Sequence, residues 1–161
     1  MLDTERLWAA LVHDEDLVCV LRGHLYIDAE LNKFIESALV DPTQLKQLPR
    51  KPWNARLELA LALGLSPGLG PPLKKFGDIR NDFAHDPDTV RISDERVKEL
   101  YGTLGDGLRS LVMRGFKVIR TQAIAEGAVV PDDRQFADLI PKARFGIIVV
   151  ALCSALHDAV T

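Results

Sequence analysis

Apolar side chains recur at helical spacing along most of the chain. Between residues 17 and 38 they follow one another at intervals of three and four, with a single histidine among them: Leu17, Val20, His24, Ile27, Leu31, Phe34 and Ala38. Because residues three and four apart lie on one face of a helix, this pattern predicts an amphipathic helix. Acidic residues at positions 14–16 favour its start, and Asp41-Pro42 predicts its end.

Further helices are predicted by the same periodicity, with glycine and proline marking their ends. We expect them over about residues 4–12, 53–63, 73–85, 93–126 and 132–160. Glycines between residues 102 and 107 predict a break in one of these helices, and Pro141 predicts a kink in the last. Residues 89–92 alternate in a way that allows a short extended segment. The prediction is an all-α fold: a single domain over residues 1–161, built as a helical bundle of about six helices.

Composition narrows the class of protein. The 161 residues carry 20 Lys and Arg against 23 Asp and Glu, a net charge of −3, which excludes a surface that is basic overall. Cys19 and Cys153 form no C-x-x-C motif, so a disulfide framework and a thiolate zinc site are excluded and a cytoplasmic location is expected. The longest apolar stretch, residues 145–156, has 12 residues. A bilayer span needs about 20, so we expect a buried helix and no membrane association.

The sequence lacks the residues that metal-dependent and hydrolytic chemistry require. The four histidines, at positions 13, 24, 85 and 157, include no H-x3-H pair, and we expect no metal and no cofactor. Residues 64–68 match G-x-S-x-G, the pattern of a nucleophile elbow. Pro67 follows the serine, however, and has no N–H to donate to an oxyanion.

The most informative segment is the predicted helix at residues 73–85. It contains Arg80, Asn81 and, four residues after Asn81, His85. Asn81 and His85 share a helix face, and the Arg80 side chain is long enough to bend toward that face. Asp86-Pro87 predicts that the helix ends directly after His85, where the helix dipole favours a protonated imidazole. A cation, an amide and a titratable histidine together favour phosphate chemistry.

The spacing of Arg80, Asn81 and His85 resembles the hallmark of the HEPN superfamily, the higher eukaryotes and prokaryotes nucleotide-binding domains. That hallmark is an arginine with a polar residue after it and a histidine beyond. The resemblance implies a small helical bundle, usually a dimer, in which arginine and histidine from two protomers form one cleft. In many members that cleft is a metal-independent endoribonuclease site, so the three residues become candidate catalytic residues.

A second resemblance covers more of the chain. Residues 56–104 comprise a leucine-rich helix that ends in Leu-Gly, a connector and the helix with Arg80 and His85. They look like the mannitol operon repressor (MltR-like) family, and Arg22-Gly23 with Glu30 suit that family's long first helix. Members are taken as transcriptional regulators, which implies a homodimer and a protein partner in transcription regulation. The chain shows no helix-turn-helix motif, and the resemblance ends before about residue 110.

A second candidate site is basic. The predicted helix over residues 108–120 carries four cations within an arc of about 140°: Arg109, Arg114, Lys117 and Arg120. Such an arc is typical of a solvated outer face, and it is also the pattern of a track along an RNA or DNA backbone.

Near the N-terminus, His24 is expected to be a hydrogen-bonded core or interface histidine, or else a neighbour of the Arg80–His85 site.

Three functions are consistent with these features. The first is a non-enzymatic regulatory protein that binds a protein partner or a nucleotide through a dimer surface or an Arg80–His85 cleft. The second is a metal-independent endoribonuclease in which His85 moves protons and Arg80 stabilises charge on phosphorus. The third is a structural or antitoxin-like partner protein, in which Arg80 pairs with Asp78, Asp82 or Glu30 and His85 caps its helix. The longer resemblance favours the first.

Overall fold

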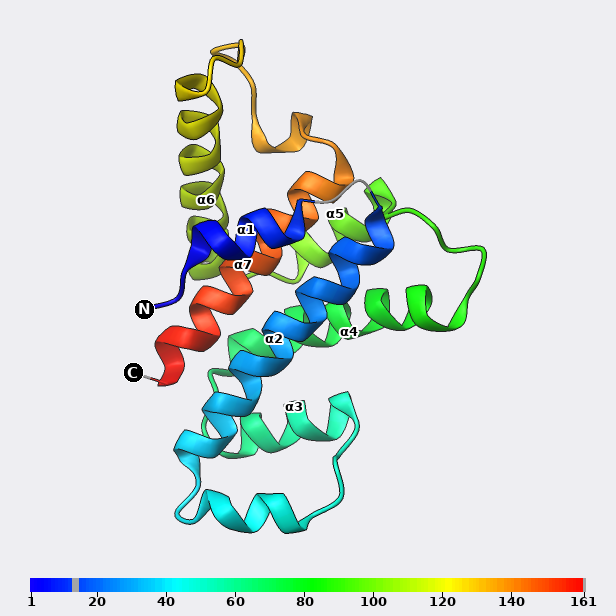
Figure 1. The fold of residues 1–161 in the computed structure, drawn as a ribbon, viewed down its shortest axis with the longest axis vertical. Coiled ribbons are helices and arrows are strands. Elements are labelled where there is room, and N and C mark those ends of the chain that lie inside the picture. The colour runs from blue at the N-terminus through cyan, green and yellow to red at the C-terminus, as the bar shows by residue number, and fades with distance from the viewer. Residues whose placement is uncertain (13–14, 161) are drawn as a thin grey trace.

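The computed structural model describes residues 1–12 and 15–160, and all regular structure within these ranges is helical (Figure 1). The all-α prediction is confirmed. The α-helices are α1 (Thr4–Leu11), α2 (Asp16–Ala38), α3 (Trp53–Ala62), α4 (Gly70–His85), α5 (Asp94–Gly102), α6 (Asp106–Ala125) and α7 (Pro141–Val160). The 3₁₀ helices are η1 (Pro42–Gln47), η2 (Pro67–Leu69) and η3 (Phe136–Asp138).

The described residues form more helices than the six predicted. Seven are α-helices, and η1, with six residues, is an eighth element longer than a single turn. The predicted break near residues 102–107 separates α5 from α6, so residues 93–126 form two helices. Between α2 and α3, Pro42 occupies the first turn of η1, and the Asp41 carboxylate accepts a hydrogen bond from the backbone N–H of Thr43 at 3.1 Å. A side-chain cap of this kind satisfies an otherwise free N–H and so favours the turn.

The predicted kink at Pro141 is wrong. Pro141 does not kink a longer helix; α7 begins there, and residues 132–140 form a loop with the short η3. Proline suits the first position of a helix because the N–H that it lacks has no intrahelical partner at that position. Residues 89–92, where the sequence allows a short extended segment, form part of the loop between α4 and α5 and no regular strand.

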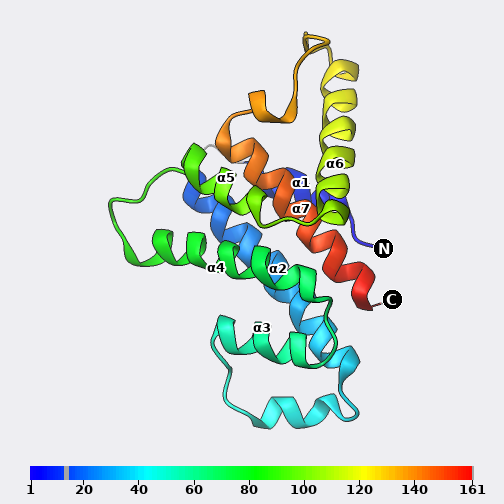
Figure 2. The same ribbon diagram turned by 180° about the vertical axis from the view of Figure 1, so that it is seen from behind.

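Helices α2 and α7 form the centre of the bundle and pack against each other more extensively than any other pair. Helices α1 and α6 contact α7, while α3 and α4 pack on α2, which α4 crosses (Figures 1 and 2). Buried apolar side chains, from Leu7 in α1 to Leu156 in α7, form one hydrophobic core. Gly23 allows α2 and α7 to approach closely, because a β-carbon at this position would lie 3.3 Å from Cγ1 of Val149.

Helix α7 is by length and composition apolar enough to cross a membrane, with a mean hydropathy of 1.6 over its most apolar window. The share of that window that is buried inside the bundle is 56%. Its buried residues include a charged one, Arg144, whose Nε donates a hydrogen bond of 3.0 Å to the carbonyl oxygen of Leu139. This packing against α2 and α6 is typical of the core helix of a folded bundle, as the sequence analysis expected of residues 145–156.

The end of α4 is held by the loop that follows it. The backbone N–H of Asp86 donates to the carbonyl oxygen of Asp82 at 2.9 Å, and the Asp86 carboxylate accepts a hydrogen bond of 2.7 Å from the Thr89 hydroxyl. Farther along the loop, the N–H of Ile92 donates to the Asp16 carboxylate at 2.6 Å, which ties the loop to the first turn of α2. These contacts fix the last turn of α4, where His85 lies.

Candidate functional site

Helix α4 buries an apolar face in the core, and the candidate residues lie outside that face. Leu73, Phe76 and Ile79 face the core, with at most 1% of each exposed. Arg80 is half-buried, whereas Asn81 and His85 are exposed. The helix therefore keeps its apolar stripe inside and leaves the polar residues of the Arg80–Asn81–His85 motif on the other side.

Arg80 and Asn81 contact each other directly. Nη1 of Arg80 donates a hydrogen bond of 2.9 Å to Oδ1 of Asn81. Nε of Arg80 is buried and has no hydrogen-bond partner among the described residues. Asn81 thus holds one end of the guanidinium without neutralising its charge, which leaves a cation that can pair with an external anion.

The ion pairs that a purely structural role predicts for Arg80 are not formed. Arg80 has no ion pair with any residue in the described ranges. The Asp82 carboxylate pairs with Arg96 instead. Asp78 is exposed and forms no ion pair within the described ranges. Glu30, the third candidate partner, is buried and pairs with Lys33 at 2.7 Å and with Nδ1 of His157 at 3.1 Å. No carboxylate in the described part of the chain therefore neutralises the positive charge of Arg80.

His85 is exposed in the last turn of α4 and makes no hydrogen bond or ion pair with the described part of the chain. The predicted capping role is wrong, because the helix ends on the backbone hydrogen bond of Asp86 and on no contact of the imidazole. No hydrogen bond links His85 to Arg80 or Asn81 either. The structure thus joins two of the three motif residues and leaves the histidine free to meet a partner from outside.

His24 lies beside Arg80 on the neighbouring helix. Its ring is 5.4 Å from that of Trp53 and 6.3 Å from that of Phe76, measured between centroids, and its Nδ1 is buried without a hydrogen-bond partner among the described residues. Burial, followed by the positive charge of Arg80, lowers the pKa of His24, while the Asp28 carboxylate opposes this effect. His24 is therefore a neutral histidine of an aromatic cluster that also borders the Arg80 site.

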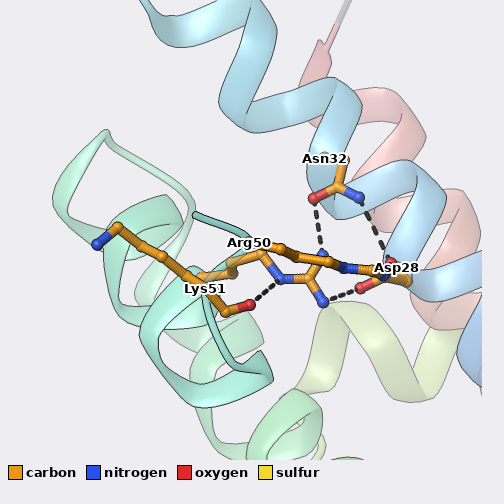
Figure 3. Close-up of polar contacts among 5 residues, drawn as sticks. Asp28, Asn32, Arg50 and Lys51 are labelled. Atoms are coloured by element: carbon orange, nitrogen blue, oxygen red, sulfur yellow. Dashed lines mark hydrogen bonds and ion pairs between the residues drawn. The ribbon is translucent and has the colours of Figure 1, made fainter. Parts of the chain in front are cut away.

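A second polar cluster, which the sequence analysis missed, surrounds Asp28 one turn after His24 (Figure 3). Asp28 is 6% exposed and pairs with the buried Arg56. Arg50 also pairs with this carboxylate, with a distance of 3.1 Å from Nη2 to Oδ2. Nη1 of Arg56 donates 2.9 Å to Oδ1 of Asn32, and Nε donates 3.1 Å to the carbonyl oxygen of Lys51. Two arginines thus converge on one buried carboxylate.

The four cations of α6 do not form a continuous free track. The Arg109 guanidinium lies over the ring of Tyr101, 5.2 Å from its centroid. Nη2 of Arg120 donates to the backbone carbonyl oxygens of Pro131 and Asp132 at 3.2 and 3.1 Å. The remaining two are exposed and, within the described ranges, have no hydrogen bond or ion pair of their side chains: Arg114 and Lys117. Half of the predicted nucleic-acid track is therefore engaged in contacts within the molecule.

Within residues 1–12 and 15–160, no group of three or more His, Cys, Asp or Glu side chains is placed to hold a metal ion. His13, one of the four histidines weighed as a ligand, lies outside the described residues.

Comparison of the chain with protein-family models, with curated proteins and with solved structures finds no match. The resemblances to the MltR-like and HEPN families stay predictions from the sequence.

Proposed function

We propose that this chain is a non-enzymatic regulatory protein that binds a partner through the Arg80–Asn81–His85 surface of α4 and acts as a cytoplasmic homodimer of a single-domain subunit. The observation that supports the proposal is the availability of the motif: Arg80 forms no ion pair with described residues, and His85 is exposed without a partner. Charged side chains that the fold does not use are available to a ligand or to a protein surface.

Binding is favoured over catalysis by the surroundings of His85. General acid–base catalysis by histidine depends on a second group that fixes the ring and its tautomer. No described residue hydrogen-bonds to the His85 imidazole, so within one subunit the ring has no such support. The longer of the two sequence resemblances, to transcriptional regulators, agrees with a binding role.

The second candidate function is the metal-independent endoribonuclease. The hydrogen bond from Arg80 to Asn81 favours it, because a guanidinium held at one end is suited to stabilise charge on a phosphorus centre. His85 would accept the proton of a ribose 2′-OH, and the histidine of a second copy would protonate the leaving oxygen.

A complementation experiment tests the regulatory proposal. Transcript levels are compared in host cells that lack the gene and in cells that carry the wild type, the double variant Arg80→Gln/His85→Ala, or the control Arg91→Gln. We expect the double variant to behave like the deletion and the control to behave like the wild type, since Arg91 is an exposed cation outside α4 and outside the cations of α6. Full complementation by the double variant, or a deletion without effect on any transcript, contradicts the proposal.

An RNA incubation in EDTA separates the two candidates. Intact RNA after incubation with the wild type supports the regulatory role. Cleavage that the His85→Ala variant loses supports the endoribonuclease, and cleavage that this variant retains excludes His85 as its catalytic residue.

A further inference from the structure

A cleft of about 300 Å³ opens on the side of the bundle where α2, η1 and α3 meet. Apolar side chains from all three elements, among them Ile35, Leu45 and Leu59, form part of its lining. Its polar lining is predominantly cationic: Asn32, Glu36, Lys46, Arg50, Lys51 and Arg56. A concave, partly apolar site with a few convergent polar groups is the usual form of a small-molecule site.

The positive charge of this cleft exceeds what the fold needs. Arg56, which is 9% exposed, neutralises the buried Asp28. One well-placed cation suffices to pair a buried carboxylate, so the second guanidinium on Asp28, that of Arg50, is in excess. The Arg50 side chain is 77% exposed and reaches Asp28 with one nitrogen only. Its remaining N–H groups are free to bind an anion in addition.

Two lysines add to this excess. The side chains of Lys46 and Lys51 line the cleft and make no ion pair with any residue in the described ranges. Glu36 is the one carboxylate in the lining, and it is an acceptor without a partner among the described side chains.

The backbone that carries two of the cations is stiffened by proline. Pro49 and Pro52 flank Arg50 and Lys51, and a residue that precedes proline is confined to extended conformations. The carbonyl oxygen of Lys51 is in turn held by the Arg56 guanidinium at 3.1 Å (Figure 3). A segment that is already ordered loses little conformational entropy when it binds a ligand.

We propose that this cleft binds a small phosphate monoester that carries hydroxyl groups, such as a mononucleotide or a sugar phosphate. Arg50 and the two lysines contact the phosphate, the Glu36 carboxylate accepts hydrogen bonds from hydroxyl groups, and the leucines pack against the body of the ligand. A cavity of about 300 Å³ is at the lower end of the range for small-molecule sites, which suits a ligand of this size. The proposal does not rest on the function of the Arg80–His85 surface.

Calorimetric titration of the full chain with four probes tests it: AMP, adenosine, ribose 5-phosphate and inorganic phosphate. We expect AMP or ribose 5-phosphate to bind at least about tenfold more tightly than adenosine and than inorganic phosphate. AMP tighter than ribose 5-phosphate identifies a nucleotide, and equal affinities identify the sugar phosphate as the recognised part. No binding at millimolar concentrations, or adenosine or free phosphate as tight as both esters, overturns the proposal.

Variants of two lining residues then test whether the ligand binds in this cleft. Arg50→Gln and Lys51→Gln change exposed side chains, so they are expected to melt near the wild-type temperature and to weaken binding about tenfold each. The matched controls Arg91→Gln and Lys74→Gln remove exposed cations outside the cleft and are expected to leave the affinity unchanged. Equal weakening by the controls shows a general charge effect and contradicts binding in this cleft.

Discussion

The indole ring of Trp53 lies directly over Gly77, so that a β-carbon at position 77 would come within 2.5 Å of the indole Nε1. Trp53 also packs edge-on against Phe76 and His24, with centroid distances of 6.3 and 5.4 Å. The absence of a side chain at Gly77 therefore lets the start of α3 seat on α4 three residues before Arg80. This contact connects the packing of the bundle with the position of the candidate site.

Gly77→Ala is expected to lower the free energy of unfolding by about 1–3 kcal/mol, because the rigid indole has to move out of its packed position. Urea unfolding measures the change. The control is Gly107→Ala in the first turn of α6, where an added β-carbon meets no atom within 4 Å. That variant gains up to about 1 kcal/mol from the higher helix propensity of alanine. An equal gain at both positions would show that Trp53 does not restrict Gly77.

His24 makes part of the stability depend on pH. Burial and the Arg80 charge lower its pKa below the ordinary value of 6.5, so at mildly acidic pH the unfolded chain binds a proton that the folded chain does not. Stability is therefore lost as the pH falls below about 6.5 and stops changing below the pKa of the folded state; above about pH 7 this histidine contributes no pH dependence.

The variant His24→Gln tests this dependence. Urea unfolding at about pH 7.5 and about pH 5.5 should show a smaller loss of stability on acidification in the variant than in the wild type. The control is Ser154→Ala, which changes a side chain that does not titrate in this range and therefore keeps the wild-type slope. Equal slopes for the wild type and His24→Gln would contradict the assignment.

Periodicity predicted the helices well, but it predicted burial less well at the two ends of the apolar series in α2, residues 17–38. Val20, Ile27 and Leu31 in the middle of α2 are fully buried, as expected. Leu17 is 39% exposed and Ala38 is also exposed. The apolar series repeats every 3.5 residues, whereas an α-helix has 3.6 residues per turn. The direction in which these side chains point therefore drifts by about 20° per heptad and by about 60° over the whole series. The two ends therefore leave the face that α7 covers.

The Asp28 cluster could not be predicted in the same way, since its partners are distant in sequence. Arg50 comes from the segment between η1 and α3, 22 residues away, and Arg56 comes from α3. Only one local signal was available: Asp28 follows His24 by four residues and so lies on the same face of α2, where a charge needs a partner. Which cation supplies that partner depends on how α2 and α3 pack, and a helical pattern carries no such information.

Arg144 is predicted to be a stabilising buried cation. It is 5% exposed, donates 3.0 Å to the carbonyl oxygen of Leu139 and pairs with Asp94 at the start of α5. Arg144→Met is expected to destabilise the fold by about 2 kcal/mol, because the carbonyl and carboxylate lose their donor. The control is Arg96→Met, which removes an exposed pair with Asp82 and should cost less than about 1 kcal/mol. Similar losses in chemical unfolding of both variants would show that burial of the Arg144 pair adds nothing.

Two histidines in the last turns of their helices provide the test that separates function from structure. Nδ1 of His157 lies 3.1 Å from Oε2 of the buried Glu30 and so links α7 to α2, whereas His85 has no partner in the described chain. His157→Ala is expected to lower the free energy of unfolding by about 1–2 kcal/mol, and His85→Ala by less than about 0.5 kcal/mol, both measured by urea unfolding near pH 7. A loss at His85 as large as that at His157 would give His85 a role in the fold and favour the structural, antitoxin-like hypothesis. A small loss at His85, combined with the failure of the Arg80→Gln/His85→Ala double variant to complement, would mean that the α4 motif serves a partner rather than the bundle.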